Sequence, residues 1–219
     1  MPRTRDSGTE QNGSSYVTVA GESVSGYNMK GSRFIGVAQP CRCESGIQSN
    51  LSALATRYPD ATHYCYAARY GGCEPVDRSS DNGEPSGTAG KPIMAVIKGS
   101  GLSDVMVTVI RYFGGTLLGT GGLVHCYTET ASLALGSVET VRYVRCSAFS
   151  FSMDYSRFSQ FEGRMRDILV GRPECTYTDN VQVKVRVEHG REDEFLARFS
   201  DFSERRIHPI SLGQEYVPR

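Results

Sequence analysis

Hydrophobic and polar positions repeat with two different periods along the chain, and these periods predict where strands and helices lie. Residues 16–20 and 32–38 are rich in β-branched, aromatic and small apolar side chains, which predicts two short strands. Residues 62–70 return to this pattern and predict a third strand. Before it, apolar residues at helical spacing predict a helix that Pro59 and Asp60 end. That apolar stripe consists of Ile47, Leu51, Leu54 and Tyr58.

The stretch VMVTVIRY at 105–112 is apolar on both faces until its end. A strand of this kind is covered on both sides, so we expect it at the centre of a sheet. The strand at 62–70 instead alternates, with Cys65 facing one side and Tyr64 the other. The short apolar run at 93–97 predicts a small helix or strand. A further helix is predicted by a stripe of Leu123, Tyr127, Ala131 and Leu135.

The pattern restarts near residues 136–140 and then predicts strand, helix, strand, strand, helix, strand. In the strand at 181–188, valines alternate with polar residues, so one face is buried and the other is wet. The two helix stripes are Phe158, Phe161, Met165 and Ile168, and Phe195, Phe199 and Phe202. The order β-α-β-β-α-β is the ferredoxin-like arrangement. We therefore predict an α+β protein with a disordered tail at 1–14, an N-terminal domain at 15–138 and a ferredoxin-like C-terminal domain at 139–219.

The composition is that of a globular protein, and its length of 219 residues fits two compact units. Hydrophobic residues make up 39% and charged residues 22%. No apolar run approaches the roughly 20 residues that span a bilayer, so we expect no membrane contact. The first 15 residues carry two arginines without an apolar region behind them. We therefore expect a tail without a secretion signal, and a cytoplasmic protein.

Cysteine count and charge narrow the candidate chemistry. Seven cysteines, an odd number, favour reduced thiols. The C-x-C pair at 41–43 and the H-x-C pair at 63–65 have no accompanying C-x-x-C pair, so we expect no metal site. Twenty-four basic and 24 acidic residues cancel, so a site for a polyanion has to be a local patch. The densest candidate for such a patch consists of Arg142, Arg145, Arg157, Arg164 and Arg166. The alternative is that these arginines only cover the solvent-facing sides of strands and helices.

Two glycine-rich segments resemble phosphate loops without matching them. SDNGEPSGTAGKPIM at 80–94 would need a glycine at 85 and a Ser or Thr at 92 to form a Walker A loop, and both positions are proline. The two prolines therefore argue against an ordinary P-loop ATPase. FGGTLLGTGG at 113–122 would need a glycine at 124 to be a dinucleotide fingerprint, but valine stands there.

The second segment still has the chemistry of an anion site. It joins a buried strand to a helix, where backbone N–H groups are free and the helix dipole favours anions. Its glycines are Gly114, Gly115, Gly119, Gly121 and Gly122. Lys91 and Arg111 are the cations that would complete such a site. The alternative is that the glycines only allow positive φ and close packing of helix on sheet.

A catalytic interpretation rests on three titratable residues. Asp81, Glu84 and His63 are the candidates for an acid or base if the loops meet in space. Neither G-x-S-x-G nor H-E-x-x-H occurs in the chain. Spacing alone leaves this alternative open.

The two segments together resemble the IMPACT / YigZ family. The resemblance covers roughly residues 30–138 and rests on RYFGGTxLGxGGL at 111–123 and on a motif loop that begins at residue 81. The motif-loop residues are Asp81, Gly83, Glu84, Gly87, Thr88 and Gly90, with His63 at the entry to the third strand. Asn82 departs from the family, where this position is often acidic. The chain is similar to the bacterial two-domain members.

The resemblance implies both a fold and a function. It implies an N-terminal domain like domain 2 of ribosomal protein S5 and a C-terminal domain like a ferredoxin-like domain of a translocation factor. We expect a non-enzymatic, translation-linked regulator, without a cofactor, that binds structured RNA or the ribosome. In this hypothesis Lys91 and Arg111 contact phosphate, the glycine amides position it, and Tyr112 stacks on a base. The alternatives are an enzyme or sensor for a small phosphorylated or carboxylated metabolite, and a protein–protein interaction module.

Overall fold

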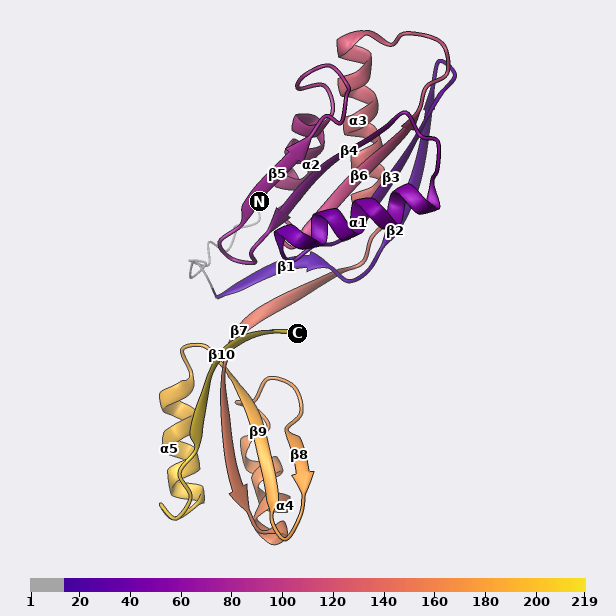
Figure 1. Ribbon diagram of the computed structural model, residues 1–219. Helices are drawn as coiled ribbons and strands as arrows, with labels where there is room; N and C mark the ends of the chain where they lie inside the picture. Colours follow the sequence, from indigo (N-terminus) through magenta and orange to yellow (C-terminus); the bar gives the residue numbers. More distant parts are fainter. Residues whose placement is uncertain (1–13) are drawn as a thin grey trace, which may run out of the picture. The chain divides into compact units, whose positions relative to one another are not determined.

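The computed structural model describes residues 14–219 and shows an α+β protein with two sheets (Figure 1). The chain divides into two compact units, one formed by Tyr16–Arg142 and the other containing Tyr143–Arg219. The predicted disordered tail at 1–14 lies outside the described residues, apart from Ser14. Across 14–219, no helix is long and apolar enough to cross a membrane.

The first unit is built on a five-stranded sheet with the order β2-β3-β6-β4-β5, in which all neighbours are antiparallel. In chain order, the elements up to residue 136 are β1 (Ser15–Val19), β2 (Ser23–Met29), β3 (Ser32–Pro40), α1 (Glu44–Arg57), β4 (His63–Tyr70), β5 (Val76–Ser80), α2 (Gly90–Ser100), β6 (Val105–Tyr112) and α3 (Gly119–Gly136). Strand β6 is central and buried except at its last residue, as its apolar pattern predicts.

Helices cover both faces of this sheet. Figure 1 shows α1 across one face and α2 with α3 on the other. Strand β4 divides its side chains as predicted: Cys65 packs in the α2–α3 core, and Ala68 packs with Ile47 of α1. Both α2 and α3 begin at the end of the sheet where β6 finishes. This end therefore receives the positive ends of two helix dipoles.

The sequence analysis did not predict two strands, β2 and β5, because they lie at the edges of the sheet. β2 and β5 each have only one strand neighbour, and their residues are half-buried or exposed. Polar residues and Gly26 interrupt any clear alternation there. The apolar run at 93–97 belongs to helix α2, which ends where Gly101 adopts a φ of 71°.

The second unit has the predicted order of strand, helix, strand, strand, helix, strand. Its elements are β7 (Thr140–Met153), α4 (Tyr155–Met165), β8 (Glu174–Tyr177), β9 (Val181–Glu188), α5 (Glu192–Phe202) and β10 (Ile210–Pro218). The strands β10, β7, β9 and β8 pair antiparallel in that spatial order, and β1 also pairs with β7. The predicted phenylalanine stripes and the valines of β9 form its core.

The arginine-rich stretch between 142 and 166 is largely engaged within the protein. Arg145 donates to Gln214, and Arg157 pairs with Asp154. The Arg164 guanidinium lies 5.7 Å from the centre of the Phe202 ring. These contacts favour the interpretation in which the arginines solvate and brace their own unit.

Candidate functional site

The predicted site residues gather at the end of the first sheet where β6 finishes and β4 begins. In the strand register, Arg111 of β6 lies between Phe34 of β3 and His63 of β4. The motif loop that follows β5 and the glycine-rich segment that follows β6 meet at the same end (Figure 1). The fold thus brings together segments that lie far apart in the sequence.

Asp81 fills the anion site that the first glycine-rich segment offers. Its Oδ2 accepts a hydrogen bond from the Gly87 amide at 2.8 Å. Its Oδ1 accepts from the amides of Ala89 and Gly90 at 2.9 and 2.8 Å. Burial raises the pKa of Asp81, but the three amide hydrogen bonds outweigh it and hold the pKa below its usual value. The loop therefore binds its own carboxylate at the start of α2.

The other motif-loop residues shape the path of the chain. Gly83 and Gly87 have φ of 87° and 78°, in the region that favours glycine. A Cβ on Gly90 would lie 3.0 Å from the backbone of Ser80. The Thr88 hydroxyl donates to the Pro85 carbonyl at 2.6 Å. These positions are explained by folding without any ligand.

Replacing Asp81 with asparagine is expected to lower the free energy of unfolding by about 1 to 3 kcal/mol at neutral pH, because one amide acceptor is lost. A lowered folded-state pKa means that this stability is fully present above the unfolded pKa of about 3.9 and is lost as pH falls through the folded pKa. The difference between wild type and variant should therefore shrink below about pH 4. Urea denaturation at several pH values measures it. The exposed Asp179→Asn is the control, and a difference that persists undiminished in acid would contradict the explanation.

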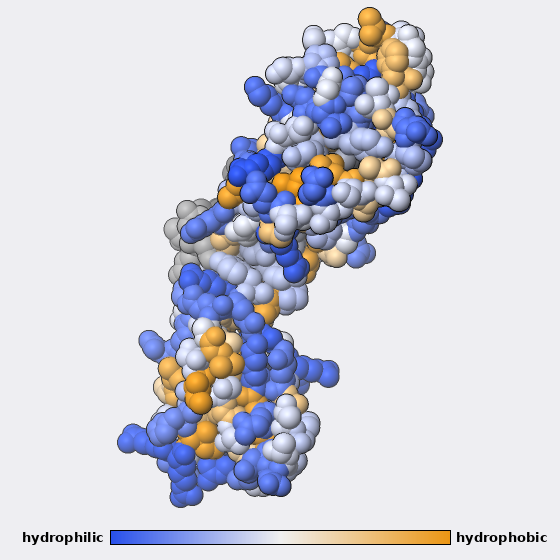
Figure 2. Space-filling model, in the orientation of Figure 1, coloured by the Kyte–Doolittle hydropathy of each residue, from blue (hydrophilic) through white to orange (hydrophobic). Residues whose placement is uncertain are grey.

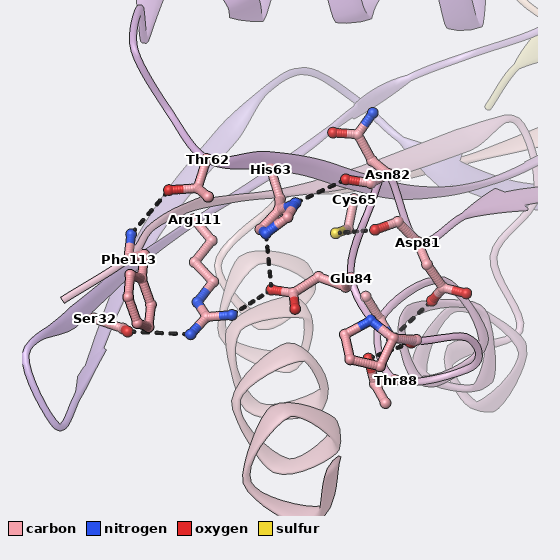
Figure 3. A network of polar contacts seen from close by, with 12 residues as sticks. Ser32, Thr62, His63, Cys65, Asp81, Asn82, Glu84, Thr88, Arg111 and Phe113 are labelled. Atoms are coloured by element: carbon pink, nitrogen blue, oxygen red, sulfur yellow. Dashed lines mark hydrogen bonds and ion pairs between the residues drawn. The ribbon is translucent and has the colours of Figure 1, made fainter. Parts of the chain in front are cut away.

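Glu84 enters the core and forms a buried ion pair with Arg111 (Figure 3). The two side chains are 3% and 6% exposed, and Arg111 Nη1 lies 2.5 Å from Glu84 Oε1. Tyr127 OH donates to the same oxygen at 2.8 Å, and His63 Nε2 lies 3.8 Å from it. Arg111 Nη2 also donates to Ser32 Oγ at 3.3 Å. The pair and these contacts link the motif loop with strands β3, β4 and β6 and with α3.

Burial holds the Cys65 thiol and the Tyr127 hydroxyl in their protonated forms by raising their pKa values. Cys65 Sγ lies 3.3 Å from Tyr127 OH and 3.0 Å from the Asp81 carbonyl. Burial raises the pKa of Cys65 to about 12, and burial also raises the pKa of Tyr127 above its ordinary value. Neither group supplies a nucleophile at neutral pH. The network has the chemistry of a folded core.

The histidines are placed differently from one another. His63 Nδ1 is hydrogen-bonded to the Asn82 carbonyl at 2.8 Å, so the ring is fixed beside the Glu84 carboxylate. His125, on α3, lies away from Glu84, and its Nε2 is 3.2 Å from Tyr27 OH of β2. Within 14–219, no three His, Cys, Asp or Glu residues are grouped so that they could hold a metal ion.

The second glycine-rich segment remains open. Gly114, Gly115, Gly119 and Gly121 are exposed, whereas Gly122 is half-buried. The first turn of α3 has no acidic side chain and no side-chain cap. Beside it, Phe113 and Leu117 are 45% and 85% exposed, and Figure 2 shows hydrophobic side chains at this tip. The Gly114 amide, predicted to position a phosphate, instead donates to Ser32 Oγ at 3.2 Å. The start of α3 therefore offers a helix dipole beside exposed apolar groups.

The three residues predicted to contact RNA have different surroundings. Lys91 is exposed at the second position of α2, with no carboxylate of the described chain within ion-pair distance. Arg111 is buried against Glu84. Tyr112 is half-buried on the α1 face, and its OH donates to the Pro59 carbonyl at 3.0 Å. A phosphate role for Arg111 stays a prediction, but its charge already has a partner.

Sequence reasoning missed three members of the network. Ser32 was part of a predicted strand, Cys65 was placed only on a strand face, and Tyr127 was counted in an apolar stripe. One signal was present, because a tyrosine in a buried stripe needs a partner for its OH. The sequence did not show that this partner is Glu84.

Comparison with known proteins decides the family. Residues 30–135 match the Impact N-terminal domain. IMPACT family member YigZ of Escherichia coli is 30% identical over 188 residues, which cover 85% of this chain and 92% of that protein. The chain belongs to the IMPACT family. Another IMPACT family member, YvyE of Bacillus subtilis, is 32% identical and covers 83% of each chain.

Solved structures add to the comparison. The crystal structure of a hypothetical protein aligns with 91% of this IMPACT chain and 98% of its own, with a TM-score of 0.64 and 29% identity. The two-domain translational regulator Yih1 aligns with 55% of this chain and 46% of its own, at 26% identity and a TM-score of 0.33. With a TM-score of 0.33, the similarity to Yih1 is too low to support a conclusion about fold or function.

Proposed function

We propose that this IMPACT family member is a non-enzymatic, translation-linked regulator that binds structured RNA or the ribosome. The proposal includes the folds that the sequence suggested: domain 2 of ribosomal protein S5 for the first unit and a translocation-factor-like ferredoxin fold for the second. The strand order β10-β7-β9-β8, with helices between β7 and β8 and between β9 and β10, supports the latter.

The observation that carries the proposal is the contrast between the starts of α2 and α3. Asp81 neutralises the start of α2, whereas the start of α3 has no carboxylate of its own. A phosphate oxygen at α3 would take the place that Asp81 takes at α2. The exposed Lys91 adds charge at this end of the sheet, and Phe113 adds an aromatic face.

Binding is favoured over catalysis by the state of the candidate acids and bases. The Asp81 carboxylate already accepts hydrogen bonds from three backbone amides, and the Glu84 carboxylate is buried in an ion pair with Arg111. His63 is then left without a carboxylate that is free to act with it on a substrate. At the starts of α2 and α3, the exposed polar chemistry is that of backbone amides and a lysine.

Replacing Thr120 with aspartate should have opposite effects on folding and binding. Thr120 is exposed in the first turn of α3, so a carboxylate there should stabilise the fold by about 0.3 to 1 kcal/mol through the helix dipole. The same charge should repel phosphate and weaken RNA binding roughly tenfold, which corresponds to about 1.4 kcal/mol. Co-sedimentation with ribosomes and subunits at low and moderate salt measures binding, and thermal unfolding measures stability.

Thr120→Asn is the matched control, since it keeps the size of the side chain without the charge. Binding that falls with salt in the wild type and in Thr120→Asn, but is weak in Thr120→Asp, supports the proposal. Equal binding by all three would contradict it. If the wild type does not bind RNA, the metabolite alternative is tested by ligand-induced rises in Tm, and the interaction module by nuclease-resistant pull-down.

A further inference from the structure

A groove lies on the α1 face of the first unit, between the end of α1 and the hairpin of β2 and β3. Its cavity volume is about 430 Å³, and its lining includes Gly26 and Asn28 of β2, Arg33 of β3 and Tyr58 after α1. Gly26 has nothing within 4 Å of the position of a Cβ, so the floor is flat and open. The volume is in the usual range for a small organic ligand.

The strand register places three polar and aromatic residues in one row at this end of the sheet. Asn28 is paired with Arg33, and Arg33 is paired with Tyr112 of β6. Ile35, two residues after Arg33, packs on the α1 side with Tyr58 and Tyr112. Since alternate residues of a strand share a face, Arg33 lies on the α1 side as well.

Arg33 is an exposed cation without an ion-pair partner in the described part of the chain. By contrast, Arg57 pairs with Glu22 at 2.6 Å, and its guanidinium lies over one side of the Tyr58 ring, 5.2 Å from the ring centre. The exposed Asp60 lies in the turn after Tyr58 and is not one of the residues that line the groove. The Tyr58 ring forms the aromatic wall of the groove. An unpaired guanidinium beside such a wall suits a ligand in which a phosphate is attached to an aromatic ring system.

The aromatic wall is held in place by its hydrogen bonds. Tyr64 OH donates to the Tyr58 carbonyl at 2.5 Å, and Tyr112 OH donates to the Pro59 carbonyl at 3.0 Å. These bonds fix the turn that carries the Tyr58 ring. A ring that is already ordered loses little entropy when a base stacks on it.

We propose that this groove binds one unpaired nucleotide of the RNA, an inference that rests on the proposed function. The base stacks on the Tyr58 ring on the side opposite the Arg57 guanidinium, which lies 5.2 Å from the ring centre. The Arg33 guanidinium binds the phosphate, and the Asn28 amide meets the base edge. A paired base in a duplex has both faces covered by its neighbours, so the groove selects single-stranded RNA. It would give the protein a preference for loops and bulges that the open start of α3 cannot supply.

The test compares a 12-nucleotide oligoadenylate with a blunt RNA duplex of the same length, bound to the full chain and followed by fluorescence anisotropy over a range of salt. Arg33→Ala should lower the slope of log affinity against log salt by about 0.7 for the single strand. Tyr58→Leu should weaken single-strand binding roughly 5- to 100-fold and leave duplex binding nearly unchanged. Asn28→Ala should narrow the preference for adenine over uridine oligomers.

Arg78→Ala is the matched control, because Arg78 is an exposed arginine on the opposite edge strand, where it pairs with Glu44. If Tyr58→Leu fails to fold, Arg33→Ala and Asn28→Ala, which change exposed side chains, decide the question. Single-strand binding within about twofold of wild type in both, with the salt slope unchanged, would overturn the groove site. The proposed function fails separately if the wild type binds neither RNA or if Thr120→Asp binds as well as the wild type.

Discussion

Replacing Arg111 with alanine is expected to lower the free energy of unfolding by about 3 to 5 kcal/mol. The change leaves the Glu84 carboxylate, 3% exposed, in the core without its ion partner. It also removes the bond to Ser32, which holds the start of β3 near the Gly114 amide. Urea or guanidinium denaturation monitored by circular dichroism measures the loss.

The double replacement Arg111→Met with Glu84→Gln is the informative companion. It removes both charges and keeps an oxygen that accepts from Tyr127 OH. Removing one partner of a buried ion pair leaves an uncompensated charge, whereas replacing both partners does not. The double variant should therefore lose less unfolding free energy than Arg111→Ala alone. If Arg111→Ala unfolds within about 1 kcal/mol of wild type, the pair does not stabilise the fold as described. Arg111 is therefore unsuited to a test of RNA binding, since its loss changes folding first.

Replacing Gly114 with alanine is expected to cost more than about 4 kcal/mol or to prevent folding. A Cβ at this position would lie 1.9 Å from the Gly31 carbonyl carbon and 2.3 Å from the Ser32 nitrogen. Both atoms belong to the backbone, so no side chain can turn aside to relieve the clash. Thermal and chemical unfolding, together with soluble yield, measure the effect.

Two neighbouring glycines give graded controls. Gly115 has a φ of 81° but nothing within 4 Å of a Cβ, so alanine there should cost only about 1 to 2 kcal/mol. Gly121 is helical and equally open, and alanine there should gain up to about 1 kcal/mol. Equal losses at 114 and 115 would show that the contact with Gly31 can relax.

Periodicity predicted the elements whose side chains are buried in a regular pattern. Strand β6, the helix stripe at Tyr127 and the phenylalanine stripes of the second unit all follow from it. The edge strands β2 and β5 carry no such pattern, because solvent accepts almost any side chain there. The central elements could therefore be predicted from the sequence, whereas the number of strands in the first sheet could not.

The candidate site was predictable in its members but not in their roles. Asp81, Glu84, His63 and Arg111 lie together at one end of the sheet, an arrangement that the sequence had left open. Sequence could not show that Glu84 points inward to Arg111, 27 positions later, instead of outward to a ligand. The direction of a carboxylate in a loop depends on the path of the backbone, and that path is set by tertiary contacts. For the same reason, the polar row of Asn28, Arg33 and Tyr112 became visible only through the strand register.

The burial of the Glu84–Arg111 pair has a consequence for every binding assay on this protein. Mobile ions screen charges that face water over about 10 Å at 0.1 M salt, but they do not penetrate a packed core. The internal electrostatics at this end of the sheet should therefore hold unchanged from dilute buffer to concentrated salt, with both partners under 10% exposed. A complex that dissociates as salt is added then reports the loss of surface contacts alone, and not a loosening of the scaffold that presents them.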